Sequence, residues 1–248
     1  MTCPDFRQLP SGQGPIVTPV IHVLDRDQTL ANIDIALEVG CPGVFLINHD
    51  FPMAPFLPIL RQVRAARPGA WLGVNFLDQP GDIAFPVLAG LAREGFSFQA
   101  YWADDARIDE AEQVQAEAAR IARIRADSGW QGLYFGGVAF KKQRPVPPEM
   151  YATAARIAAR YMDVVTTSGI ATGQEADLSK IETFRSALGT APMALASGIT
   201  PDNAARYCDA VNCFLVATGI NLPGDFYNID PARLAALLSV IRTHGASS

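Results

Sequence analysis

Long hydrophobic runs are absent from this sequence of 248 residues. No window approaches the roughly 18 consecutive apolar residues that a membrane-spanning helix needs. The N-terminus also lacks the charged segment followed by an apolar segment that marks a secretory signal peptide. We therefore expect neither a membrane span nor a signal peptide.

Cysteine is also scarce. The four cysteines are Cys3, Cys41, Cys208 and Cys213, and no two of them form a C-x-x-C pair. This pattern favours reduced, mostly buried thiols over a disulfide framework. Such thiols are typical of a cytoplasmic protein, and that is the location we expect.

Charged residues are few, at 18% of the chain, and the net charge is −5. A negative chain argues against a general nucleic-acid-binding surface. Hydrophobic residues make up 49% of the sequence, which excludes a disordered chain and supplies a large core. We expect a folded protein that does not bind nucleic acid.

Short apolar runs that end in glycine, with helical stretches between them, dominate the last third of the sequence. They occupy residues 163–169, 192–198 and 212–219. Such runs indicate βα units of a parallel sheet. Each run ends in Ser or Thr followed by Gly, where a backbone can approach a ligand closely and amides can point at an anion.

The remainder of the sequence repeats this alternation. Further strands are predicted at residues 16–23, 43–50, 70–76, 97–102 and 132–140, and helices at 30–39, 56–66, 83–94, 110–126, 147–161 and 231–241. Asp27 and Thr29 offer cap positions for the first helix, while Thr200 and Pro201 suit the start of a helix after the seventh strand.

Eight evenly spaced strands, each followed by a helix, predict an α/β fold: a single (β/α)8 TIM barrel rather than a doubly wound sheet. The length of 248 residues is typical of one such barrel. We expect one domain over residues 1–248, with 1–15 as an N-terminal arm and 245–248 as a tail.

The seventh and eighth strands end in the best candidate for an anion site. Ser197, Gly198, Thr218 and Gly219 lie where phosphate-binding barrels usually hold the anion, through backbone amides and a helix N-terminus. The alternative is that turns between strands and helices simply favour glycine. We expect these four residues to bind phosphate.

Polar residues follow the other strands, and reacting groups in such barrels lie at the carboxyl ends of the strands. The expected substrate contacts are His22, Asn48, Asn75, Ser168 and Thr172. Each of these residues could equally belong to the polar rim of an ordinary barrel.

Three charged residues are the catalytic candidates. Asp50 or Asp104 could move a proton beside the anion site. Lys141, just beyond a buried strand, could balance ligand charge or, less favoured, form a Schiff base. The alternative for Lys141 is a solvated rim cation beside Lys142 and Arg144.

Metal and cofactor signatures are missing. His22, His49 and Asp50 could supply ligands, but no H-x-H or H-E-x-x-H spacing occurs. No G-x-G-x-x-G opens a helix, and no G-x-S-x-G surrounds a serine. We expect no metal and no cofactor.

Several segments of the chain resemble the BtpA family, a group of barrels of the ribulose-phosphate-binding type. The similarity is strongest at residues 168–174 (Ser-Gly-Ile-Ala-Thr-Gly-Gln) and 197–203 (Ser-Gly-Ile-Thr-Pro-Asp-Asn), with support at 20–23 and 73–76. The sequence differs from the family pattern at the end of the fourth strand, where residues 100–104 read Ala-Tyr-Trp-Ala-Asp.

The resemblance implies a TIM barrel but does not fix a reaction, since members are linked to photosystem I biogenesis or described as sugar- or nucleoside-processing enzymes. We expect an enzyme acting on a small phosphorylated ligand, a sugar phosphate or nucleotide-like compound, with lyase, isomerase and hydrolase chemistry open. The alternative is a non-catalytic assembly factor that uses the barrel as a scaffold. Self-association as a homo-oligomer is expected on general grounds.

Overall fold

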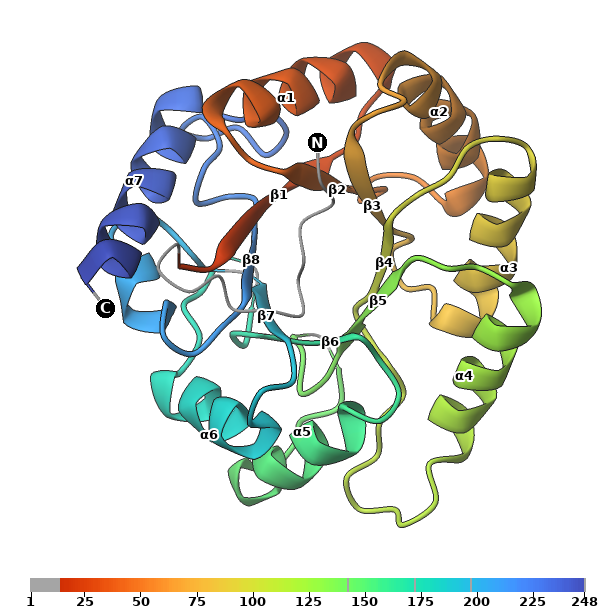
Figure 1. Cartoon of the computed structure of the whole chain (residues 1–248), viewed down its shortest axis with the longest axis vertical. Coiled ribbons are helices and arrows are strands. Elements are labelled where there is room, and N and C mark those ends of the chain that lie inside the picture. The colour runs from red at the N-terminus through yellow and green to blue at the C-terminus, as the bar shows by residue number, and fades with distance from the viewer. Residues whose placement is uncertain (1–13, 142, 172, 197, 248) are drawn as a thin grey trace.

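The computed structural model describes residues 14–141, 143–171, 173–196 and 198–247, and within them eight parallel strands close into a barrel surrounded by helices (Figure 1). The strands are β1 Ile16–His22, β2 Gly43–Ile47, β3 Trp71–Asn75, β4 Ala100–Ala103, β5 Leu133–Gly137, β6 Val164–Ser168, β7 Met193–Ala196 and β8 Cys213–Val216. Their spatial order follows the sequence, and β1 pairs with β8 to complete the ring. The predicted TIM barrel is confirmed.

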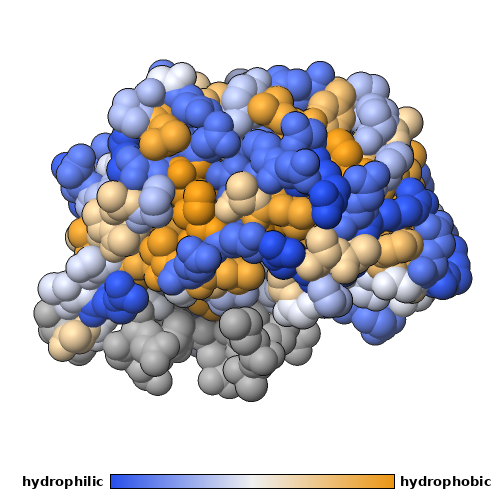
Figure 2. All heavy atoms as spheres, turned by 90° about the horizontal axis from the view of Figure 1, so that it is seen from above, coloured by the Kyte–Doolittle hydropathy of each residue, from blue (hydrophilic) through white to orange (hydrophobic). Residues whose placement is uncertain are grey.

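Within the described residues, seven α-helices and two short 3-10 helices cover the outside of the barrel. They are α1 Arg26–Val39, α2 Met53–Ala66, α3 Gly81–Arg93, α4 Ala116–Ser128, η1 Pro148–Met150, α5 Tyr151–Ala158, α6 Leu178–Leu188, η2 Ala204–Tyr207 and α7 Pro231–Ser247. Of the described residues, no helix is both long enough and apolar enough to cross a membrane. Figure 2 shows polar side chains over much of one side of the molecule, with apolar patches between them.

The predicted helix after the seventh strand is wrong. The described chain between β7 and β8 contains only η2, a single 3-10 turn. Asn203 explains this, because its side-chain oxygen accepts the Thr200 N–H at 2.9 Å and its amide donates to the Gly198 carbonyl at 2.7 Å. The side chain of Asn203 thus closes the turn that Thr200 was expected to open as a helix cap.

Three helix ends also differ from their predictions. Asp25, and not Asp27 or Thr29, caps α1 by accepting the Gln28 N–H at 2.8 Å. Helix α4 begins at Ala116 instead of residue 110, because the Gln115 amide donates to the Asp109 carbonyl at 2.6 Å and holds a loop there. Helix α7 continues to Ser247, so residues 245–247 extend a helix and do not form a tail.

Side chains fill the interior of the barrel. Phe45 lies at its centre and meets the rings of Trp71, Trp102 and Phe135 edge-on, with centroids 5.5, 6.1 and 5.2 Å away. Gly73 on β3 leaves the space that the Phe45 ring occupies. The barrel is therefore a packed core and not a pore, as in other barrels of this size.

The cysteines behave as the sequence predicts wherever they are described. Cys41, Cys208 and Cys213 are free and buried. Burial raises the pKa of the Cys41 and Cys213 thiols to about 12. Both thiols are therefore protonated and unreactive at neutral pH, and Cys3 lies outside the described residues.

Replacing Gly73 with alanine should destabilise the protein by about 1–3 kcal/mol, because the new methyl group would overlap the Phe45 ring in a core with no room to adjust. Urea unfolding measures the change. Gly90→Ala is the matched control: apart from its chain neighbours and the backbone of α3 itself, no heavy atom of the described residues lies closer than 4.0 Å to the added carbon. This variant should therefore gain about 0.5–1 kcal/mol. Equal midpoints for the two variants would contradict the packing of the barrel interior.

Candidate active site

A small cavity lies at the carboxyl ends of the strands. Its floor is the apolar top of the barrel interior, and its polar or glycine lining includes His22, His49, Asp104, Lys141, Gly173, Gly198, Thr218 and Gly219. Its volume is about 60 Å³, well below the roughly 300–1,000 Å³ of common ligand pockets. The cavity thus joins six of the predicted site residues from five strand ends in a confined space.

Asp104 follows β4 and is held at the cavity wall by its neighbours. The buried Asn75 amide donates to Asp104 Oδ1 at 2.9 Å. Gln143 donates to the Asp104 carbonyl oxygen, and Gly137 lacks the Cβ that would overlap that oxygen. Asn75 therefore orients a carboxylate and does not itself line the cavity.

Lys141 is positioned through its backbone. Its N–H donates to Ser168 Oγ at 2.8 Å, and the Ser168 hydroxyl donates to the Gly169 carbonyl at 2.8 Å. The Lys141 ammonium lies 5.7 Å from the Phe140 ring centroid, and Lys141 is one of the residues that line the cavity. Ser168 is fully buried and does not line the cavity. Its hydroxyl oxygen instead fixes the main chain of Lys141.

Lys180, on the first turn of α6, is a buried cation that the sequence did not single out. Its ammonium donates to the Ala139 carbonyl at 2.6 Å and to the Ser168 carbonyl at 2.8 Å. Ala139 has a left-handed backbone with φ of 47°, a conformation that costs a non-glycine residue energy. Lys180 therefore ties the strained end of the β5 loop to β6. Sequence spacing gives no signal for this role, because a lysine at a helix start normally faces solvent.

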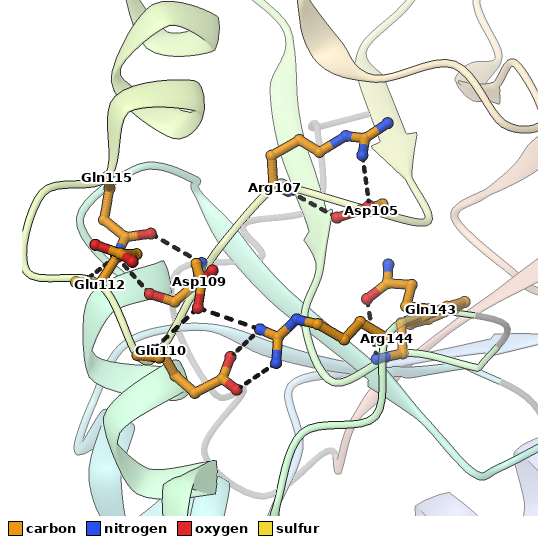
Figure 3. A network of polar contacts seen from close by, with 10 residues as sticks. Asp105, Arg107, Asp109, Glu110, Glu112, Gln115, Gln143 and Arg144 are labelled. Carbon is orange, nitrogen blue, oxygen red and sulfur yellow. Dashed lines mark hydrogen bonds and ion pairs between the residues drawn. The ribbon is translucent and has the colours of Figure 1, made fainter.

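An ion pair links the loops that follow β4 and β5 (Figure 3). The Arg144 guanidinium donates to both carboxylate oxygens of Glu110, at 2.6 and 2.8 Å. The Glu110 side chain is only 3% exposed, and its pKa lies below the ordinary value because of these bonds. This pair anchors the two loops that carry Asp104 and Lys141.

His22 at the end of β1 is buried in the cavity wall. Its ring stacks on Phe226 at a centroid distance of 3.8 Å, and its Nδ1 lies 2.9 Å from the Phe226 carbonyl oxygen. Since a carbonyl only accepts, Nδ1 carries the proton in the neutral ring and Nε2 is an acceptor. Burial lowers the His22 pKa to about 4, so the ring is neutral at pH 7.

Asn48 and Asp50 do not line the cavity. The buried Asn48 amide donates to the Phe51 carbonyl at 2.7 Å, and its oxygen accepts the Leu77 N–H at 3.0 Å, so it joins two loops. Asp50 lies on the rim with 39% of its side chain exposed. Partial burial would raise its pKa, but hydrogen bonds from His49 and Tyr227 outweigh that effect and lower it.

The predicted phosphate-binding glycines meet other loops very closely. Gly198 has a φ of 73°, and a Cβ there would overlap the Gln174 carbonyl. A Cβ on Gly219 would overlap the Ile199 carbonyl. Loop packing alone therefore accounts for glycine at both positions, although both residues and Thr218 also line the cavity. Ser197 and Thr172 lie outside the described residues.

The arrangement offers acid–base and charge-balancing groups. Asp104 can accept a proton, Lys141 can neutralise an anion, and neutral His22 can accept a hydrogen bond. Within the described parts of the chain, no three His, Cys, Asp or Glu side chains gather in a way that could hold a metal ion.

The neutral state of His22 gives a direct prediction. A histidine whose folded pKa is about 4 instead of 6.5 should keep its ring proton signals constant as the pH falls from 7 until it approaches the lower value. As the pH falls from about 6.5 to about 4, the unfolded chain binds a proton that the folded protein does not. The free energy of unfolding should therefore decrease as the pH falls through this range. A ¹H NMR titration tests this, with His22→Gln identifying the signals. A midpoint near 6.5 would contradict the buried placement.

Lys180 predicts a pH response of the same sign in a more alkaline window. Burial lowers its pKa from 10.5 to about 8, so the unfolded chain binds more protons between these values and stability rises with pH there. The contribution is up to about 3 kcal/mol. Unfolding by urea across this pH range should show a steeper rise for the natural protein than for Lys180→Met. Parallel curves would show that Lys180 is solvated.

Comparison with known proteins shows which family this barrel belongs to. The sequence matches the model of the BtpA family over residues 71–243, whereas no curated protein matches it. Among solved structures, phosphoribosyl anthranilate isomerase from Thermus thermophilus superposes with a TM-score of 0.62 at 16% identity, covering 92% of this chain and 98% of that one. The tryptophan synthase alpha subunit from Legionella pneumophila str. Paris gives 0.63 at 14% identity, covering 98% and 97%.

Such low identities show a shared fold only. The family match is stronger evidence, because it spans more than half of the sequence and includes β3 to β8. It agrees with the resemblance seen at residues 168–174 and 197–203. The protein belongs to the BtpA family.

Proposed function

We propose that this protein is an enzyme that acts on a small phosphorylated ligand, a sugar phosphate or nucleotide-like compound, at the carboxyl end of the barrel. One observation carries the proposal: a single cavity is lined by Asp104 and Lys141 on one side and by Gly198, Thr218 and Gly219 on the other. The first pair offers proton transfer and charge balance, and the second group offers backbone amides and a hydroxyl to an anion.

Roles follow from the contacts of each residue. Asp104, oriented by Asn75, moves a proton. Lys141, fixed by Ser168, balances the charge of the ligand, and neutral His22 accepts a hydrogen bond from it. Asp50 on the rim is a weaker candidate for the base because its carboxylate bonds to His49 and Tyr227. Lyase, isomerase and hydrolase chemistry all fit these groups.

A barrel of similar fold supports the choice of ligand class. A phosphoribosyl anthranilate isomerase with a TM-score of 0.63 and 14% identity was solved in complex with reduced 1-(o-carboxyphenylamino)-1-deoxyribulose 5-phosphate. That ligand carries a phosphate group. At such identity the parallel is one of fold, so the ligand class remains our proposal.

A second candidate is a non-catalytic assembly factor, the role implied by family members linked to photosystem I biogenesis. The small volume of the cavity, about 60 Å³, favours this candidate, because a barrel used only as a scaffold has no need of an open pocket. The cytoplasmic location and the homo-oligomeric state also stay predictions.

A thermal-shift panel of inorganic phosphate, sugar phosphates and nucleotides tests the enzyme proposal. A ligand at about 100 times its dissociation constant should stabilise the protein by roughly 2.7 kcal/mol. Lys141→Met and Thr218→Val should each weaken binding, the lysine change by about tenfold or ~1.4 kcal/mol. Substitution of Gly219 would not separate binding from folding, since any side chain there would overlap the Ile199 carbonyl.

Arg160→Met is the control variant. It removes one exposed cation between α5 and β6, at the opposite end of the barrel, and should leave every shift unchanged. If no compound stabilises the natural protein, the enzyme proposal fails and the scaffold role gains support. If the control loses as much binding as Lys141→Met, the ligand is held by overall charge and not by this cavity.

A further inference from the structure

Trp102, near the end of β4, has a buried donor that finds no acceptor among the described residues. The residue is 4% exposed and its ring belongs to the packed interior of the barrel. It also lines the cavity described above. Its indole Nε1 is buried, and no atom of the described residues accepts a hydrogen bond from it.

Such a group calls for a physical explanation. An indole N–H can only donate, and a buried donor left unpaired loses its hydrogen bond to water without compensation. The rings of Phe45 and Phe140 meet Trp102 at steep angles of 83° and 68°, but a contact with an aromatic face is a weak substitute for an oxygen acceptor. Because Trp102 lines the cavity, a ligand bound there can supply the missing acceptor.

The position of Trp102 determines which part of a ligand it could meet. Strands β4 and β8 lie across the barrel from each other, because the eight strands close in sequence order (Figure 1). Thr218 and Gly219 follow β8, whereas Asp104 follows Trp102 by two residues and lines the same cavity. A phosphate held near Thr218 would thus leave the other end of the ligand facing Trp102.

We propose that Trp102 donates a hydrogen bond from Nε1 to a hydroxyl or carbonyl oxygen at the end of the ligand remote from its phosphate. The inference rests on the proposed function and sharpens it. It selects phosphorylated compounds that carry an oxygen acceptor at the far end, as sugar phosphates do, and disfavours inorganic phosphate alone. Trp102 is a specificity-determining residue in this arrangement, beside the carboxylate of Asp104.

NMR of the indole N–H groups tests the proposal directly. The sequence contains three tryptophans, so Trp71→Phe, Trp102→Phe and Trp130→Phe assign the three signals. The probes are inorganic phosphate, ribose 5-phosphate and ribulose 5-phosphate, added to ¹⁵N-labelled protein. A pentose phosphate should move the Trp102 indole proton downfield, as expected when it gains an oxygen acceptor, and inorganic phosphate should leave it in place.

Affinities measured by calorimetry give the second readout. Trp102→Phe keeps the aromatic bulk but loses the donor, and should weaken pentose phosphate binding by about tenfold while binding of inorganic phosphate is unchanged. Trp130→Phe is the matched control, because Trp130 stacks on Phe85 in the outer core and does not line the cavity. It should change neither affinity.

The outcomes separate this inference from the proposed function. If the natural protein binds none of the three probes, the phosphate proposal fails and this inference fails with it. If a pentose phosphate binds but the Trp102 signal stays in place and Trp102→Phe binds equally well, only the role of Trp102 is overturned. An equal loss of both ligands in Trp102→Phe would also overturn it, since the effect would not be confined to the far end. Should Trp102→Phe fail to fold, the signal in the natural protein, assigned by elimination from the other two variants, still decides.

Discussion

The close approach of one loop backbone to another at the mouth of the barrel is the constraint on which the site depends. Gly137 touches the carbonyl of Asp104, Gly198 that of Gln174, and Gly219 that of Ile199, each so closely that a Cβ would overlap. A single methyl group at any of these points would push two loops apart. Tight packing of this kind resists gradual deformation. The close contacts between the loops therefore keep the cavity small and its shape constant.

Buried polar contacts then hold the charged groups at the edge of that cavity. Asn75 orients the Asp104 carboxylate, and Ser168 fixes the backbone of Lys141. Lys180 binds the Ser168 carbonyl and so supports the same segment from the helix side. Interactions of this kind cost stability if only half satisfied, yet they preorganise groups whose positions matter for chemistry. Asn75 and Ser168 were expected to contact the substrate. They instead position Asp104 and Lys141, the two charged residues that line the cavity.

The electrostatic character of the cavity follows from its burial. Removal from water keeps His22 neutral, which makes its Nε2 an acceptor. The same low polarity strengthens any interaction between Lys141 and an anion. A confined, largely apolar space with few polar groups suits a small ligand that is bound through specific contacts. The indole N–H of Trp102, which finds no acceptor among the described residues, favours a ligand that brings an oxygen acceptor.

The sequence by itself determined the barrel, because apolar runs, glycine ends and helical stretches are local patterns whose alternation admits few folds. It also identified which polar residues follow strands, and hence Asp104, Lys141 and Thr218. Only the tertiary structure decided which polar residues at the strand ends share a cavity. Asp104 lines the cavity and Asp50 does not, because the loops that carry them turn in different directions. Lys180 became visible only there, since its partner carbonyls lie 12 and 41 residues away. Contacts over such separations depend on how the closed barrel brings its strand ends together, and local sequence patterns do not encode them.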